Sequence, residues 1–281
     1  MDFRARPATW HEVGKGSWRP HLIPMPGFTA SALSAVLVLT ATAAAAQGSI
    51  ATDRPGLTFN PTVVPAGAFQ VEVGTPQATR NRTGDVSATL FNAPTQLRYG
   101  ITPRLEARVF STVYNSLSAD GPGADADGFG DVEVGLKYQI LTAAPGGTPN
   151  LSFIPSVVLP TGQDGFTVGD PVVNANVAAG FALPNAFGIT VLAGATIPTA
   201  DDTNVNANLA VLLGRSFTPQ LSGYVEAGAF PTDGATPLFA GAGLAYLVSN
   251  TVQLDAFFDA GLNDEAADLL AGVGVSFRLG R

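Results

Sequence analysis

The sequence predicts an all-β chain that forms a transmembrane antiparallel β-barrel of about twelve strands, of the outer-membrane type. Three observations support this prediction. The 281 residues are 46% hydrophobic and 13% charged, with a mean hydropathy of +0.25. After residue 47, however, no apolar stretch reaches the ~18 residues of a membrane helix, and apolar and polar residues instead alternate in short runs. The connections between these runs are alternately short turns and longer polar loops, as in outer-membrane barrels.

The N-terminal segment 1–46 has the features of an export signal, although it is long for one. Four basic residues precede an apolar core at 32–39, and Ala44-Ala45-Ala46 fits the small-residue pattern of a cleavage site before Gln47. The core is short and rich in alanine, which disfavours the alternative of a single anchoring helix. Met25 is an alternative start, but a chain that begins there has no positive charge before the core. We expect export with either start.

The composition of the chain after residue 46 excludes several classes of protein. This part contains no His, Trp, Met or Cys, and it carries 20 of the 22 acidic residues but only 10 of the 14 basic ones. Without Cys there is no disulfide framework, and the acidic balance excludes a basic nucleic-acid-binding surface. Without His, a serine nucleophile lacks its usual base. Carboxylates inside a barrel more often form a structural network than an acid–base pair. We therefore predict no enzymatic activity, no cofactor and no metal.

Twelve alternating runs make up the predicted barrel at residues 68–281. In the run 132–140, for example, Val134 and Leu136 alternate with Glu133 and Lys137, so one face is apolar and the other charged. The expected strands are 69–73, 91–99, 105–114, 132–140, 151–159, 173–183, 187–197, 205–213, 221–229, 238–248, 252–262 and 269–279. Pro155 has no N–H to donate to a ladder, and we expect a β-bulge there.

Two kinds of connection link the expected strands. The short turns lie at 100–104, 184–186, 217–220 and 249–250, and the connection at 142–150 is somewhat longer. The other set is richer in Asp, Gly, Asn and Thr, and it lies at 75–86, 115–128, 161–171, 199–203, 231–235 and 263–268. An even number of strands with short turns at one rim and longer loops at the other is the pattern of a barrel with periplasmic turns and outer loops.

Aromatic residues mark the rim that carries the short turns. Five of them share the apolar parity, and each lies near the end of an even-numbered strand: Tyr99, Tyr138, Phe181, Tyr246 and Phe277. Barrels place such residues outward at the membrane interface, whereas a soluble sandwich has no reason to align them. We also expect an outward-facing set of apolar residues in mid-membrane: Val134, Leu136, Leu209, Val211, Ala256 and Val273.

The polar parity predicts a charged lumen. In the stretch LRYGITPRLEARV at 97–109, Arg98, Glu106 and Arg108 all occupy even positions on two strands joined by a short turn. We expect these residues to form Arg–carboxylate pairs in the periplasmic half of the barrel, because an unpaired buried charge is costly. The residues predicted to line the lumen and a transport path are Arg98, Glu106, Arg108, Glu133, Lys137, Arg215, Glu226, Asp255, Asp259 and Arg278. Tyr114 is also expected on the polar parity.

Short motifs along nearly the whole chain after residue 46 resemble the outer-membrane protein family of the MetA pathway of phenol degradation. They are TDRPG (52–56), QVEVG (70–74), QLRYGIT (96–102), GFGDVEVGLKYQ (128–139), LPTG (159–162), GLN (261–263) and GVSFR (274–278). The resemblance implies an outer-membrane barrel that passes aromatic or hydrophobic compounds. One departure is the C-terminus, because such barrels usually end on an aromatic residue and Gly280-Arg281 stand here.

Two further segments leave alternatives open. The sequence DADGFGD at 125–131 resembles the start of a calcium loop, but Leu136 stands where such a loop requires Glu, and we favour a solvated acidic outer loop. The segment 47–67 shows no sustained alternation. It is either a periplasmic tail or a plug inside the lumen, and the charged pair Asp53 and Arg54 slightly favours the plug.

These features predict a passive channel or transporter for small compounds in the outer membrane of a Gram-negative bacterium. The alternative is a structural or adhesive barrel with a sealed lumen, since twelve strands lie between the filled eight-stranded barrels and the open 16–18-stranded porins. The mixed lumen charges argue against strong ion selectivity. The expected partners are outer-membrane lipid, the barrel-assembly machinery and a small-molecule solute, with no nucleic acid.

Overall fold

The computed structural model describes residues 48–83, 86–120, 125–144, 147–200 and 204–280. All of them belong to one compact unit of the chain. The predicted export signal at 1–46 lies outside the described residues and stays a prediction. Within these ranges, no helix has the length and apolar character needed to cross a membrane.

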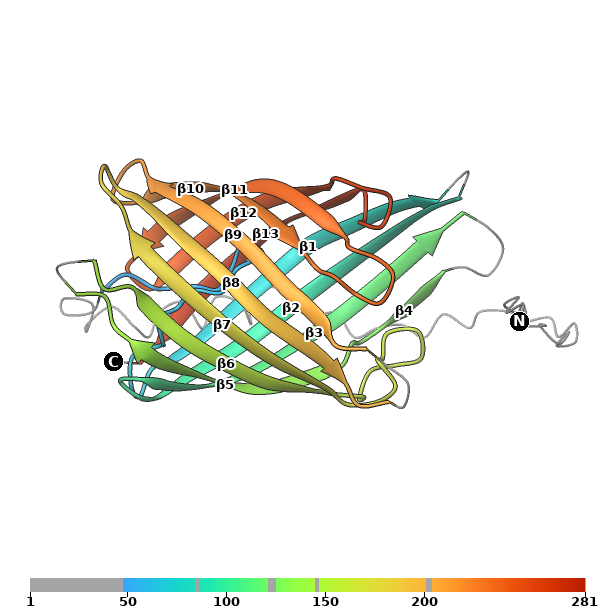
Figure 1. The fold of residues 1–281 in the computed structure, drawn as a ribbon, viewed down its shortest axis with the longest axis horizontal. Coiled ribbons are helices and arrows are strands. Elements are labelled where there is room, and N and C mark those ends of the chain that lie inside the picture. The colour runs from blue at the N-terminus through green and yellow to red at the C-terminus, as the bar shows by residue number, and fades with distance from the viewer. Residues whose placement is uncertain (1–47, 84–85, 121–124, 145–146, 201–203, 281) are drawn as a thin grey trace, which may run out of the picture. The chain divides into compact units, whose positions relative to one another are not determined.

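Twelve antiparallel strands close into a barrel, which confirms the predicted fold class and strand number (Figure 1). β1 pairs with β2 on one side and with β13 on the other, and this second pairing closes the cylinder. β3 pairs with β2 and with β5, while the three-residue β4 pairs only with the far end of β3. From β5 to β13 each strand pairs with the next in the sequence.

The strand bounds are β1 Phe69–Thr83, β2 Val86–Thr102, β3 Leu105–Ala119, β4 Ala126–Gly128, β5 Val132–Leu141, β6 Asn150–Leu159, β7 Val172–Ala182, β8 Phe187–Pro198, β9 Asn206–Ser216, β10 Leu221–Ala229, β11 Leu238–Ser249, β12 Val252–Gly261 and β13 Leu269–Leu279. Each predicted run lies within one of these strands, except that the runs 173–183, 205–213 and 252–262 each extend one residue beyond it.

The barrel is polar inside and apolar outside. Arg98, Glu106 and Lys137 have 0% of their surface exposed, whereas many large apolar side chains are exposed. The predicted mid-membrane residues are all among the exposed ones: Val134, Leu136, Leu209, Val211, Ala256 and Val273. Such an apolar exterior matches a hydrocarbon environment, in which a closed cylinder also leaves no backbone group unpaired. The predicted lipid face is therefore confirmed.

The aromatic residues lie at the rim of the short turns, as predicted. Four of them are between 41% and 49% exposed: Tyr99, Tyr138, Phe181 and Tyr246. Phe277 is half-buried and shares the outward parity of the exposed Val273. Phe69 of β1 is paired with Tyr99 of β2, so it belongs to the same ring of aromatic residues, which we call the aromatic belt. Aromatic side chains are enriched at the membrane–water interface, where the ring contacts the hydrocarbon and a polar group such as the Tyr hydroxyl contacts water.

The first hairpin is longer than predicted. Residues 75–86 were expected to form a loop, but β1 continues to Thr83 and β2 starts at Val86, with Gln77 paired to Asn92. A register shift between Gly74 and Gln77 interrupts the parity of β1. Neither face of the β1 part, Gln77 to Thr83, is apolar, so alternation does not reveal this part of the strand, although its backbone still forms a ladder.

Two local predictions are wrong. The expected bulge at Pro155 is absent, because β6 keeps one register from Ser152 to Val158 against β7. A strand tolerates the missing N–H of one proline where the residues on either side keep their backbone hydrogen bonds to the neighbouring strands. A register shift instead occurs in β3, where Pro94 pairs with Thr112 but Asn92 pairs with Asn115. This shift exchanges the two faces of β3, and Tyr114 is therefore exposed rather than inward.

Candidate functional site

Arg98 of β2 is the centre of a buried charge cluster. Its Nε lies 2.9 Å from Glu106 Oε1 of β3, and one terminal nitrogen lies 2.8 Å from Glu72 Oε1 of β1. The other terminal nitrogen donates to Glu106 Oε2 at 2.9 Å, which makes this pair bidentate. The register explains the cluster, since Arg98 is paired with Gln70 and Arg108, and Glu106 with Lys137. The predicted Arg–carboxylate pairs are confirmed.

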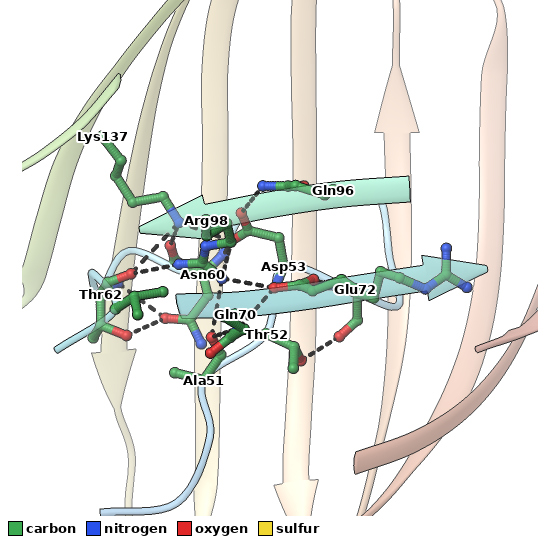
Figure 2. Close-up of polar contacts among 12 residues, drawn as sticks. Ala51, Thr52, Asp53, Asn60, Thr62, Gln70, Glu72, Gln96, Arg98 and Lys137 are labelled. Carbon is green, nitrogen blue, oxygen red and sulfur yellow. Dashed lines mark hydrogen bonds and ion pairs between the residues drawn. The ribbon is translucent and has the colours of Figure 1, made fainter. Parts of the chain in front are cut away.

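Asp53 from the N-terminal segment completes this cluster (Figure 2). One of its oxygens lies 2.7 Å from a terminal nitrogen of Arg108, and the other lies 2.8 Å from Lys137 Nζ. Arg98 approaches the same carboxylate at 3.7 Å, and Gln96 donates to it at 3.2 Å. Three cations thus face three carboxylates, those of Asp53, Glu72 and Glu106.

The charge state of Asp53 follows from these neighbours. Burial alone would raise the pKa of its carboxyl, but the positive charges of Arg98, Lys137 and Arg108 hold that pKa well below its usual value. The ionised form of Asp53 is therefore favoured by its neighbours. Its backbone N–H also donates to Glu72, at 3.0 Å from Oε2, so the segment is held by main chain and side chain together.

The N-terminal segment 48–67 contacts inward-facing residues around the barrel wall. Its backbone groups receive or donate hydrogen bonds on many strands: Ala51 O with Gln70, Thr62 O with Arg98, Val64 N with Glu106, Asn60 O with Lys137, Pro61 O with Ser152 and Leu57 N with Glu226. These partners belong to β1, β2, β3, β5, β6 and β10, so the segment runs across the lumen rather than along one side. We call it the lumen segment.

The tip of the lumen segment is apolar. Leu57 and Phe59 pack against four inward residues of consecutive strands, namely Ile154, Ala178, Leu192 and Ala210. The sequence analysis did not identify this patch. Its signal was present, because positions 178, 192 and 210 are apolar on a parity that elsewhere carries Asn174, Asn176 and Asn208. Apolar residues on the otherwise polar inner face indicate that another apolar group covers them.

Arg54 and Asp255 form a second contact between the lumen segment and the wall. The Arg54 terminal nitrogen lies 3.2 Å from Asp255 Oδ1 of β12. The Arg54 side chain lies against the paired glycines Gly74 of β1 and Gly274 of β13, where a Cβ would come within 2.3 Å or 2.6 Å of it. Glycine is therefore required at both positions for the side chain to reach β12.

Glu226 and Asp259 stand apart from the cations. Glu226 accepts a hydrogen bond from Leu57 N at 2.7 Å. Asp259 is fully buried, and its side chain is hydrogen-bonded to that of Glu226. The lumen beside β10 and β12 therefore holds more acidic than basic side chains, unlike the cluster around Arg98.

The other predicted lumen residues lie away from both groups. Glu133 accepts a short hydrogen bond from Ser156 and lines a cavity. Arg278 is 5% exposed and donates to Gly48 O at 2.7 Å. The prediction for Arg215 is wrong: this side chain is exposed on the outward parity of Leu213, and its Cζ lies 4.9 Å from the ring centroid of Phe187. Position 215 was assigned with the polar residues of its run, although its odd number places it with the outward ones.

A cavity of about 160 Å³ lies between Phe59 and the barrel wall. Phe59 stacks under the guanidinium of Arg108, with the Arg108 Cζ 4.8 Å from the ring centroid. Phe110, Glu133 and Ser156 complete an aromatic and polar lining. The cavity is bordered by both the lumen segment and the charge cluster.

The acidic stretch at 125–131 organises outer loops. Asp131 accepts hydrogen bonds at 2.7 Å from the backbone N–H groups of Gly162 and Val168, which belong to the loop after β6. Burial raises the pKa of Asp131, but these backbone hydrogen bonds outweigh it and lower the pKa below its usual value. In the part of the chain that the structure describes, no group of three or more metal-ligating side chains is placed to hold a metal ion.

This arrangement defines a closed β-barrel of the outer-membrane type, with a charged lumen that its own N-terminal segment crosses. A family described as "Putative MetA-pathway of phenol degradation" matches residues 52–279, and the chain belongs to this family. The family resemblance of the sequence motifs is thus confirmed. No curated protein matches the chain.

Two solved structures are similar to this chain to different degrees. An outer-membrane channel from Pseudomonas putida F1 is similar with a TM-score of 0.66 and 15% identity, over 80% of this chain and 99% of that one. The translocator domain of the autotransporter NalP from Neisseria meningitidis has a TM-score of 0.47 and 12% identity, over 77% of this chain and 90% of that one. At 15% identity the first similarity shows the barrel fold and nothing beyond it.

Proposed function

We propose that the protein is a passive channel for small solutes in the outer membrane of a Gram-negative bacterium, with the lumen segment as its plug. The ion-paired docking of Asp53 in the charge cluster is the observation that carries this proposal. The apolar exterior, the aromatic belt and the family support the membrane location. The short turns and the belt would face the periplasm, where the barrel-assembly machinery acts.

The plug is suited to be displaced rather than to form part of the wall. One isolated parallel bridge, Ala66–Gly100, joins it to the ladder within the described residues. Its other contacts are mostly side-chain hydrogen bonds and ion pairs, which water can replace once the lumen is wet. Leu57 and Phe59 provide the apolar packing at its tip. A plug held in this way can leave without disturbing a single strand.

The cavity beside Phe59 supports a small aromatic or hydrophobic solute that carries one polar group. Phe59 and Phe110 offer ring faces, while Arg108 and Ser156 offer donors. A solute at this point would touch both the plug and Arg108, the residue that holds Asp53. Entry of the solute and release of the plug would then be linked.

The experiment compares single-channel conductance of the full chain with that of a variant that lacks residues 48–66, in planar bilayers. We expect rare or small openings of the full chain and a stable, larger conductance of the deletion variant. Heat-modifiable gel mobility checks that both barrels are folded. Liposome uptake of a small aromatic acid should rise in parallel.

The alternative is a structural or adhesive barrel with a sealed lumen. This alternative is favoured by the contacts of the lumen segment with six strands, β1, β2, β3, β5, β6 and β10, which would hold it in place. If the deletion variant is folded but neither conducts nor takes up solute, the charge cluster supports the wall and the sealed barrel is correct.

A further inference from the structure

An apolar groove of about 570 Å³ lies on the outer face of the barrel across β8–β12. Its larger borders include Leu213, Leu244 and Phe258, which have outward parity and are 40%, 51% and 52% exposed. Most residues that line the groove have outward parity, and none of them lines the cavity beside Phe59. The proposed channel makes no use of this groove.

The strand register explains the hollow. Leu213 is paired with Val225, Val225 with Ala242 and Ala242 with Phe258, which forms one row across four strands. In the next row Arg215 is paired with Gly223, Gly223 with Leu244 and Leu244 with Ala256. Small residues at 242 and 256 thus alternate with large ones and leave a depression in the wall, while the side chains of Phe217 and Leu244 cover Gly223.

One positively charged residue, Arg215, lies at one end of this groove. Arg215 lies one residue before the end of β9, at the rim of the short turns, and its guanidinium stacks on Phe187. The charged strand residues Arg98, Lys137 and Arg278 near the same rim all turn inward and are buried. An arginine on the outer face is tolerated at the interface because its head reaches the headgroup level while its stem stays among the chains.

We propose that the groove holds an acyl chain of one anionic phospholipid, whose phosphate binds Arg215. The hollow accepts the chain, and the guanidinium offers parallel donors to phosphate oxygens at the depth where the headgroup lies. Net negative charge on the headgroup, as in phosphatidylglycerol, adds attraction that zwitterionic phosphatidylcholine lacks. The inference rests on the proposed membrane location but not on transport.

The test uses the absence of cysteine from the whole chain. A bimane label on Ala227→Cys reports on the groove, because Ala227 faces outward beside it on β10 without lining it. A label on Val134→Cys, an outward position on β5, is the reference. Quenching is measured in vesicles that contain either dibrominated phosphatidylglycerol or dibrominated phosphatidylcholine at equal mole fraction.

We expect phosphatidylglycerol to quench the Ala227 label with about fivefold higher apparent affinity than phosphatidylcholine, and the Val134 label with no preference. Arg215→Gln should abolish the preference, and Arg104→Gln, an exposed arginine in a turn of the same rim, should leave it intact. Ala256→Leu, which adds a larger side chain at an exposed position that lines the groove, should reduce the preference.

Several results would overturn the proposal. Equal quenching by the two lipids, or a preference that survives Arg215→Gln, would show that the groove holds ordinary annular lipid. Relief of quenching by millimolar benzoate would show a solute site instead. If neither lipid quenches either label, the membrane location itself is refuted. Loss of the lipid preference alone has no bearing on the conductance experiment.

Discussion

Asp53 shows how one residue can decide the state of the lumen. Its carboxylate joins cations from β2, β3 and β5, although it belongs to a segment without regular structure. Breaking a buried ion pair leaves uncompensated charge, which costs about 3–5 kcal/mol. A change at this position therefore acts on the plug far more than on the strands, whose ladder does not depend on it.

We expect Asp53→Asn to loosen the plug and leave the barrel folded. Asparagine can still accept a hydrogen bond, but it removes the negative charge that balances Arg108 and Lys137. Channel openings in planar bilayers should become more frequent, with unchanged heat-modifiable mobility. Asp164→Asn, at an exposed outer-loop position, is the control. Identical opening statistics for the wild type and Asp53→Asn would show that this charge does not hold the plug.

Leu209 and Asn208 provide a residue-scale test of the two barrel faces. Leu209 is 44% exposed on the outer face, while the side chain of Asn208 bonds Thr196 and Asn176 inside. Arginine facing mid-membrane lipid costs about 2–4 kcal/mol in a barrel. Leu209→Arg should therefore lower the free energy of unfolding of the barrel in lipid vesicles by about that amount, and Asn208→Arg should lower it by clearly less. Equal losses in denaturant titrations would contradict the assignment of faces.

At the scale of elements, the loop after β6 is held by a carboxylate. Asp131 accepts from Gly162 and Val168, and thereby ties the loop after β6 to the start of β5. Its pKa is lowered by these backbone hydrogen bonds against the effect of burial. A group with a depressed folded pKa stabilises the fold above its unfolded pKa, about 4 for Asp, and loses that contribution as pH falls through the folded value.

We expect Asp131→Ala to release the loop after β6. Amide hydrogen exchange at Gly162 and Val168 should accelerate in the variant at neutral pH, because both N–H groups lose their acceptor. In the wild type, the protection relative to intrinsic exchange should be constant from pH 8 to pH 5 and should fall only below about pH 4. Asp125→Ala, at an exposed neighbouring position, should leave these two amides protected. Loss of protection between pH 8 and pH 5 would show that another group holds the loop.

The elements also show what the sequence can and cannot predict. Alternation identified all twelve strands because bilayer contact imposes one apolar face on each of them. It missed the outer half of β1, where Gln77 to Thr83 have no apolar face, and it misplaced Tyr114, because a register shift in β3 cannot be seen in a single strand. The lumen residues Arg98 and Glu106 were predictable from parity, but the partner of Arg108 was not. Asp53 is distant in the sequence, and only the three-dimensional path of the lumen segment brings it there.

At the scale of the whole molecule, charge is unevenly distributed between the two rims. The described outer loops carry many acidic residues, among them Asp120, Asp164, Asp170, Asp233, Asp264 and Glu265, whereas the short turns carry Arg104 and no acidic residue. A solute that enters from the outer side first meets negative potential, which repels anions at long range and is screened by salt. Within the lumen, the cluster around Arg98 is balanced, and the excess negative charge lies at Glu226 and Asp259.

We expect the channel without residues 48–66 to prefer cations weakly. The deletion removes one charge of each sign, Asp53 and Arg54. Among the described wall residues the inward charges are then Arg98, Arg108, Lys137 and Arg278 against Glu72, Glu106, Glu133, Glu226, Asp255 and Asp259. Because opposite charges are mixed along the path, the preference should be small. The reversal potential in a KCl gradient measures it directly.

The carboxylates without a cation should account for most of that preference. Replacing Glu226 by Gln and Asp259 by Asn in the deletion variant leaves four inward carboxylates against four inward cations, so the reversal potential should move close to zero. Replacing Glu106 by Gln instead removes a charge that Arg98 already balances, and it should shift the potential toward anions. At 1 M salt, where the Debye length is about 3 Å, the differences between variants should largely disappear. A reversal potential that indicates anion preference in the deletion variant would mean that Arg98, Arg108 and Lys137, released from Asp53, control the path. The charge cluster, and not the pair on β10 and β12, would then be the selectivity-determining part of the channel.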